Sequence, residues 1–117
     1  MGTNYYLVKK QPTVREPIHI GKSSAGWLFC FQRQNLPWLD DPIVWNTWPQ
    51  VRSRLQQLTE GEGRYVILNE YDEPVPFREF EWLVQRKQED PACSGNPDNF
   101  TWTDNVDGYR FTDGDFR

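Results

Sequence analysis

Apolar and polar positions alternate along the first third of the chain, which is the pattern of short β-strands. The alternation runs through residues 4–10, breaks at two prolines within residues 11–17, and resumes over residues 18–22 and 27–32. A turn rich in Ser and Gly joins the last two segments. The pattern therefore predicts three strands that form a small antiparallel sheet.

A packed loop and a helix are predicted next. Residues 35–46 contain Pro37 and Pro42 among large apolar side chains, too apolar for a free linker and too interrupted for one regular element. Thr47 can cap a following helix, with Gln50 three residues on as in a capping box. At helical spacing this helix would bury Trp48, Val51, Leu55 and Leu58 and end at Gly61 and Gly63.

The second half of the chain predicts one more strand, a second helix and a short hairpin. Residues 64–71 contain a continuous apolar run, and residues 76–88 begin with Pro and carry an apolar stripe opposite charged residues. An Asp-Gly turn within residues 105–108 separates two aromatic pairs. We therefore expect an α+β fold, a small, mainly antiparallel sheet with two helices packed on it, in one domain over residues 1–117.

Composition favours an aromatic core and argues against one class of partner. The 117 residues include six Trp, five Tyr and seven Phe, each of which buries more area than an alanine or valine. The formal net charge is −4, whereas proteins that grip the phosphate backbone need a basic surface. Non-specific binding to nucleic acid is therefore not expected.

Cysteine usage and hydropathy predict the compartment. Cys30 and Cys93 lie in unrelated contexts, and with a single His they cannot supply four zinc ligands without carboxylates. The chain shows no signal peptide and no apolar run long enough to cross a membrane. We expect a cytoplasmic protein with reduced thiols, no membrane segment, no metal and no cofactor.

Residues 19–27 carry the most informative chemistry. They place an imidazole, an ammonium and two hydroxyls beside two glycines and a large aromatic ring. Ammonium and hydroxyl groups can bind a phosphate, Gly allows close backbone approach, and an aromatic ring can stack on a base. The pattern predicts a site for an anionic, ring-bearing small molecule. The predicted ligand-binding residues are Asn4, Tyr5, Tyr6, His19, Lys22, Ser23, Ser24 and Trp27.

Residues 19–27 also allow three other interpretations: a phosphate loop, a plain turn and a hydrolytic site. Gly-Lys-Ser resembles a phosphate loop, but Glu16 stands where a Walker A motif needs glycine and no helix-forming run follows. In the plainest alternative, residues 21–26 are only a turn, with His19 hydrogen-bonded in the interior and Lys22 in water. Hydrolysis of a nucleotide signal is a lesser alternative, because the single His and its short spacing to Ser do not suit nucleophilic or two-histidine chemistry.

Three separated segments resemble a family of small tailed-phage and prophage proteins. They are the Met-Gly-Thr-Asn-Tyr-Tyr start, the His-Ile-Gly-Lys-Ser segment that leads to Gly26-Trp27, and the Gly-Tyr-x-Phe segment at residues 108–111 followed by Phe116. The resemblance spans almost the whole chain. It implies a phage origin, and it implies no settled activity.

The resemblance also suggests a setting for the predicted site. Small acidic phage proteins often blunt host defence, so we expect an anti-defence protein in the host cytoplasm. It would sequester a nucleotide-type immune signal, such as a cyclic oligonucleotide or an ADP-ribose derivative, without catalysis, and a homo-oligomer could share the pocket. The alternative is an inhibitor that binds a host protein through exposed aromatic side chains. The candidates for that surface are Trp38, Trp45 and Trp102.

Overall fold

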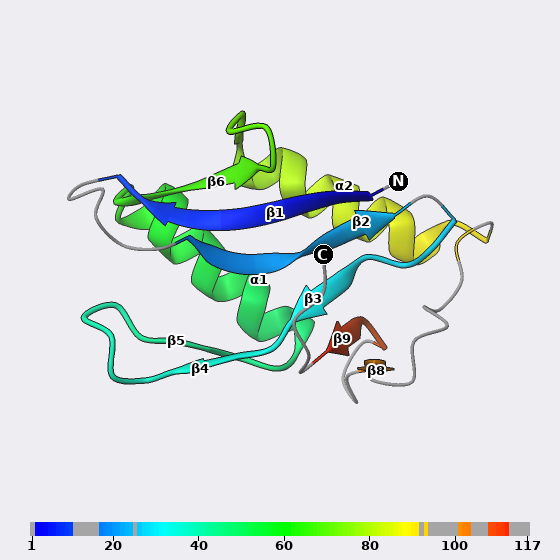
Figure 1. The fold of residues 1–117 in the computed structure, drawn as a ribbon, viewed down its shortest axis with the longest axis horizontal. Helices are drawn as coiled ribbons and strands as arrows, with labels where there is room; N and C mark the ends of the chain where they lie inside the picture. Colours follow the sequence, from blue (N-terminus) through cyan, green and yellow to red (C-terminus); the bar gives the residue numbers. More distant parts are fainter. Residues whose placement is uncertain are drawn as a thin grey trace.

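In the part of the chain that the structure describes, seven strands form one sheet, and two helices lie on a single face of it (Figure 1). The computed structural model describes residues 2–10, 17–24, 26–91, 93, 101–103 and 108–112. The sheet order is β7-β6-β1-β2-β3-β9-β8, and neighbouring strands are antiparallel except for the parallel pair β3 and β9. The strands are β1 (Gly2–Lys9), β2 (Ile18–Ser24), β3 (Cys30–Gln32), β6 (Tyr65–Asn69), β7 (Pro74–Val75), β8 (Thr101–Thr103) and β9 (Arg110–Thr112).

The hydrophobic core lies between this sheet and the helices. These are α1 (Trp48–Gln56), which continues as the π-helical turn η1 (Gln57–Gly61), and α2 (Phe77–Glu89). Phe80 of α2 packs edge-on against Phe29, with 5.5 Å between ring centroids. The predicted α+β fold, with two helices on a mainly antiparallel sheet, is confirmed. The predicted stripe of the first helix is buried: Trp48, Val51, Leu55 and Leu58.

A hairpin replaces the packed loop that the sequence predicts. β4 (Gln34–Leu36) and β5 (Ile43–Trp45) pair antiparallel as a separate two-stranded sheet. Pro37 and Pro42 stand just outside the paired positions, so neither removes a donor from the ladder. Trp45 is fully buried, and its indole donates a hydrogen bond to the Gln32 carbonyl at 2.8 Å.

The predicted capping box at the start of α1 does not form. Thr47 makes no side-chain capping bond, and Gln50 Oε1 instead accepts the backbone N–H of Asn46 at 2.8 Å. Pro49 at the second helical position has no N–H, so only the N–H of Gln50 remains for the Thr47 side chain to accept, and that bond is not made.

The aromatic tail joins the sheet through β9. β8 and β9 form an antiparallel pair, as expected for a hairpin, and most of the predicted turn, residues 105–107, lies outside the described residues. Trp102 is half-buried and stacks on Phe111, with 5.2 Å between ring centroids. In the described part of the chain, neither helix is long and apolar enough to cross a membrane.

Candidate functional site

The predicted binding residues lie mainly on β1 and β2, which pair with a bulge. Tyr5 stands opposite Gly21 and Tyr6 opposite His19, so Ile20 is one extra residue on β2. Side chains alternate between the two faces of a sheet along each strand. The predicted set is therefore divided between the face that the helices cover and the face that they leave uncovered (Figure 1).

Tyr5 and Ser23 lie on the helix-covered face. The Tyr5 ring packs against Phe80 with 5.5 Å between centroids. Burial, and then the charge of Glu79, raises the pKa of the Tyr5 hydroxyl. Ser23 Oγ accepts a hydrogen bond from Lys87 Nζ of α2 at 3.0 Å, and burial lowers the pKa of Lys87. These two side chains join the helix to the sheet and lie on the opposite face from Asn4, Tyr6 and His19, so the structure does not bring all eight predicted residues together, and a role for Tyr5 and Ser23 in ligand binding stays a prediction.

Asn4, Tyr6 and His19 form one array on the uncovered face. His19 Nε2 donates to Asn4 Oδ1 at 2.9 Å, because an amide oxygen can only accept. The Tyr6 ring lies against the imidazole, with 5.2 Å between centroids and a 31° tilt. Glu70 Oε1 accepts the backbone N–H of Asn4 at 2.7 Å. The array is thus held in place by hydrogen bonds while its side chains stay partly exposed.

Lys22 and Ser24 converge above Gly2 on this same face. In the ladder, Lys22 stands opposite Asn4, and Ser24 stands opposite Gly2. A Cβ atom at Gly2 would lie 2.5 Å from Lys22 Cε and 2.6 Å from Ser24 Oγ, so a larger residue there would displace these two side chains from the positions that they share. Among the described residues, none pairs with the Lys22 ammonium. We call Gly2, Lys22 and Ser24 the glycine seat.

Trp27 stands apart from this array. The strand predicted over residues 27–32 begins only at Cys30, and Trp27 lies in the turn before it. Its backbone N–H donates to the Ser24 carbonyl at 3.2 Å, and its side chain is 37% exposed. Stacking of a ligand on Trp27 stays a prediction.

A pocket of about 310 Å³ opens on the uncovered face next to the array. Tyr6 forms one wall, and Glu70 and Asp72 supply carboxylates. Lys22 does not line it, so any ligand that uses both features must extend across Asn4. The other lining residues are Val8, Pro17, Leu68 and Asn69.

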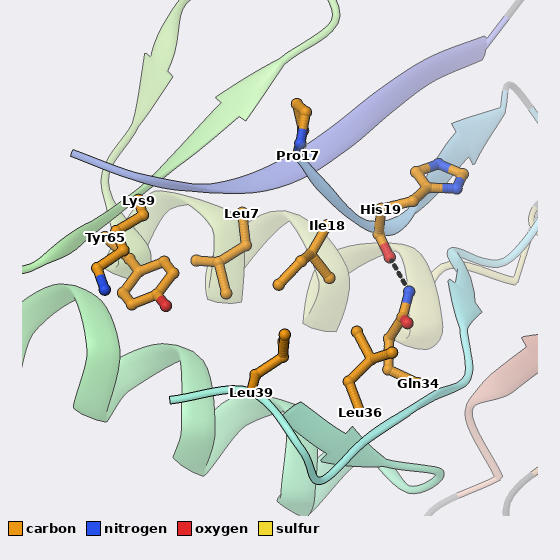
Figure 2. A pocket seen from close by; sticks show the side chains of 9 residues that line it. All are labelled: Leu7, Lys9, Pro17, Ile18, His19, Gln34, Leu36, Leu39 and Tyr65. Atoms are coloured by element: carbon orange, nitrogen blue, oxygen red, sulfur yellow. Dashed lines mark hydrogen bonds between the residues drawn. The ribbon is translucent and has the colours of Figure 1, made fainter. Parts of the chain in front are cut away.

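A second pocket, of about 360 Å³, lies between β2 and the hairpin segment that follows β3 (Figure 2). His19 contributes its backbone carbonyl, which accepts a hydrogen bond from Gln34 Nε2 at 3.0 Å. The imidazole ring points away from this pocket (Figure 2). The His19 backbone therefore faces the second pocket, whereas its ring belongs to the array with Asn4 and Tyr6.

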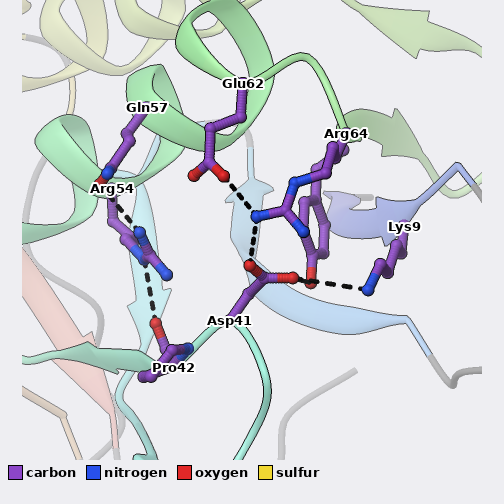
Figure 3. Close-up of polar contacts among 8 residues, drawn as sticks. Lys9, Asp41, Pro42, Arg54, Gln57, Glu62 and Arg64 are labelled. Carbon is purple, nitrogen blue, oxygen red and sulfur yellow. Dashed lines mark hydrogen bonds and ion pairs between the residues drawn. The ribbon is translucent and has the colours of Figure 1, made fainter.

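A charged cluster surrounds Asp41 at the far end of β1 (Figure 3). The carboxylate accepts hydrogen bonds from Arg64 at 2.5 Å and from the Tyr65 hydroxyl at 3.0 Å, and Lys9 Nζ lies 3.5 Å away. Arg64 also donates a hydrogen bond to the Glu62 carboxylate. Burial opposes the charge of Asp41, but these hydrogen bonds and cations outweigh it and lower the pKa of the carboxyl. The cluster ties β1, β6 and the hairpin together.

Gly2, Val8, Leu68 and Glu70 were not among the predicted site residues. Gly2 reaches the site because it stands opposite Ser24 on β2, and Val8 lies on the same face as Tyr6, two residues further along β1. Leu68 and Glu70 reach it because β1 pairs antiparallel with β6, with Tyr6 opposite Leu68. The two strands are far apart in sequence, and no local pattern specifies which strands become neighbours. The acidic turn after β6 was the available signal, but it does not show which strand it lies beside.

Neither a metal cluster nor a known relative assigns a role to this face. Within the described ranges, no group of three or more His, Cys, Asp or Glu side chains could hold a metal ion. Comparison with known proteins finds no matching family model, no significant match among curated proteins and no significantly similar solved structure. The geometry of the uncovered face is therefore the basis for the functional proposal.

Proposed function

We propose that this protein captures a small nucleotide-type anion on the uncovered face of the sheet. The observation that carries the proposal is the glycine seat, joined through Asn4 to the ring pair of Tyr6 and His19. The seat offers an ammonium and a hydroxyl that suit a phosphate. The ring pair offers an aromatic surface that suits a base.

The acidic side of the neighbouring pocket suits the sugar of a nucleotide. Ribose hydroxyls are hydrogen-bond donors, and carboxylates such as Glu70 and Asp72 are acceptors that pair well with them. In this arrangement the phosphate lies over Gly2, the base lies on Tyr6, and the sugar faces Glu70. The carboxylates favour a ligand with a sugar over a simple polyphosphate.

Useful affinity requires the three parts of the site to act together. A charge-assisted hydrogen bond contributes about 1.5–3 kcal/mol, and a stacked base contributes about 1–3 kcal/mol. Two phosphate contacts and one stack supply roughly 4–9 kcal/mol before the cost of association, so contacts to the sugar are also needed for a dissociation constant near 1 μM, which corresponds to about 8.2 kcal/mol.

The resemblance to small phage proteins supports an anti-defence setting for this binding. Sequestration of an immune signal in the host cytoplasm requires affinity and abundance, and it needs no catalytic group. His19 suits a positioning role, because its Nε2 proton is engaged by Asn4. An assembly of several copies that completes the seat across an interface is compatible with the proposal.

Thermal melting with a ligand panel tests the proposal. The panel contains cyclic dinucleotides, cyclic trinucleotides and ADP-ribose. A ligand at about 100 times its dissociation constant adds about 2.7 kcal/mol of stability, which raises the midpoint by roughly 10 °C for a chain of this size. We expect one class to do so, and we expect Lys22→Ala and Tyr6→Leu to remove the shift.

Lys10→Ala is the matched control, because it removes the same charge from an exposed position at the end of β1. It should melt like the wild type and keep the ligand shift. If no ligand in the panel raises the midpoint, or if Lys10→Ala and Lys22→Ala act alike, the proposal fails.

One observation favours a second candidate, an inhibitor of a host protein. Trp38 is 73% exposed at the tip of the hairpin, and Val44 on β5 is 50% exposed. Exposed Trp side chains are frequent anchors of protein interfaces. Trp45 and Trp102 do not contribute in the expected way, because the first is buried and the second is half-buried against the core. If this candidate is correct, Trp38→Ala abolishes inhibition of the host protein, and no ligand in the panel raises the melting midpoint.

A further inference from the structure

The second pocket exists because β2 and β3 separate. They pair only at Gly21–Phe31 and Lys22–Cys30, and the chain then leaves the sheet to form the hairpin. The amide of Gln34, in place of a backbone N–H, satisfies the His19 carbonyl across the gap. The gap that remains is the pocket of about 360 Å³ (Figure 2). This volume falls within the range of small-molecule sites.

The lining of this pocket is amphipathic. Its charged residue is Lys9, whose side chain is only 13% exposed and whose Nζ lies 3.5 Å from Asp41, beyond the usual hydrogen-bond distance. Arg64 and Tyr65 already occupy the Asp41 carboxylate at shorter distances. The rest of the lining is mainly apolar: Leu7, Pro17, Ile18, Leu36, Leu39 and the Tyr65 ring, with Gln34.

Among the residues that the structure describes, Asp41 is the acceptor that lies near the Lys9 ammonium, and at this long distance an ammonium largely removed from water favours an added acceptor. The single cation among the described lining residues suits one negative charge, and the Asp41 carboxylate behind Lys9 disfavours a dianion such as a phosphate monoester. The leucines and Ile18 suit a hydrocarbon chain.

We propose that this pocket binds a medium-chain aliphatic monocarboxylate, with its carboxylate on Lys9 and its chain between Ile18 and Leu39. The linings of the two pockets share Pro17, but the polar groups differ: Lys9 lines this pocket, whereas Tyr6 and Glu70 line the other, and the His19 ring points away from this pocket (Figure 2). The monocarboxylate proposal can therefore be tested, and rejected, without affecting the proposed function.

Titration with hexanoate and octanoate, followed by NMR of the backbone amides, tests the proposal. We expect saturable shifts at Leu7, Leu36 and Leu39, and an affinity gain of roughly fourfold for each added methylene. Octanamide has the same chain without the charge, so it should bind at least about tenfold more weakly than octanoate.

Variants separate this site from general hydrophobic adsorption. Lys9→Met should weaken octanoate binding at least about tenfold, whereas Lys10→Met, next to it on the chain, should leave binding unchanged. Because Lys9→Met also disturbs Asp41, Leu39→Trp provides a second test by filling the pocket, and Lys22→Ala should have no effect. The proposal is overturned if octanoate does not saturate, if octanamide binds equally well, or if neither Lys9→Met nor Leu39→Trp weakens binding.

Discussion

Asp41 is a buried carboxylate whose charge is balanced by its neighbours. Its pKa is lowered from the ordinary value of 3.8, so the folded state binds its proton less readily than the unfolded state. By linkage, its contribution to stability is complete above a pH of about 3.8 and is lost as the pH falls through the lower pKa of the folded state. The charge of one residue thus makes the fold acid-sensitive.

We predict that Asp41→Asn lowers the free energy of unfolding by about 1–3 kcal/mol near neutral pH, because it weakens the bonds from Arg64 and Tyr65. The difference from the wild type should shrink as the pH falls below about 3.8. Urea unfolding of both proteins across acidic and neutral pH measures this. A difference that stays constant at every pH would contradict the account of the cluster.

At the scale of elements, the hairpin of β4 and β5 divides two tryptophans between opposite environments. Trp45 is 0% exposed and Trp38 is 73% exposed. We predict that Trp45→Ala lowers the free energy of unfolding by about 3–5 kcal/mol, whereas Trp38→Ala changes it by less than about 0.5 kcal/mol. Equal losses in urea unfolding would show that the hairpin packs differently.

The helices could be predicted from the sequence more fully than the hairpin. Periodic apolar residues such as Val51, Leu55 and Leu58 specify a buried helix face locally. The hairpin contains Pro37 and Pro42, which in the sequence indicate a loop without regular structure. In the structure both stand outside the paired positions of the two strands. The parallel pairing of β9 with β3 was not predictable either, because it joins segments about 80 residues apart in sequence with no local signal.

At the scale of the whole molecule, the uncovered face of the sheet holds the candidate site. Lys22, His19 and Tyr6 could be predicted as site residues from their chemistry, and the structure places them on one face. The separation of Tyr5 and Ser23 from this face follows from the alternation of side chains along each strand. That His19 shares a face with Lys22 was not predictable from the sequence, because it depends on the bulge at Ile20, which shifts the alternation along β2. Residue type predicts what a site can bind, whereas strand register decides which residues share it.

Backbone NMR of the wild type titrated with the same cyclic dinucleotides, cyclic trinucleotides and ADP-ribose tests the central claim most directly. We expect one ligand to shift the amide signals of Asn4, Tyr6, His19, Lys22 and Ser24, and we expect Lys22→Ala to abolish those shifts while the protein stays folded. Shifts centred on Trp38 and the hairpin, or no shifts with any ligand in the panel, would contradict capture on the uncovered face.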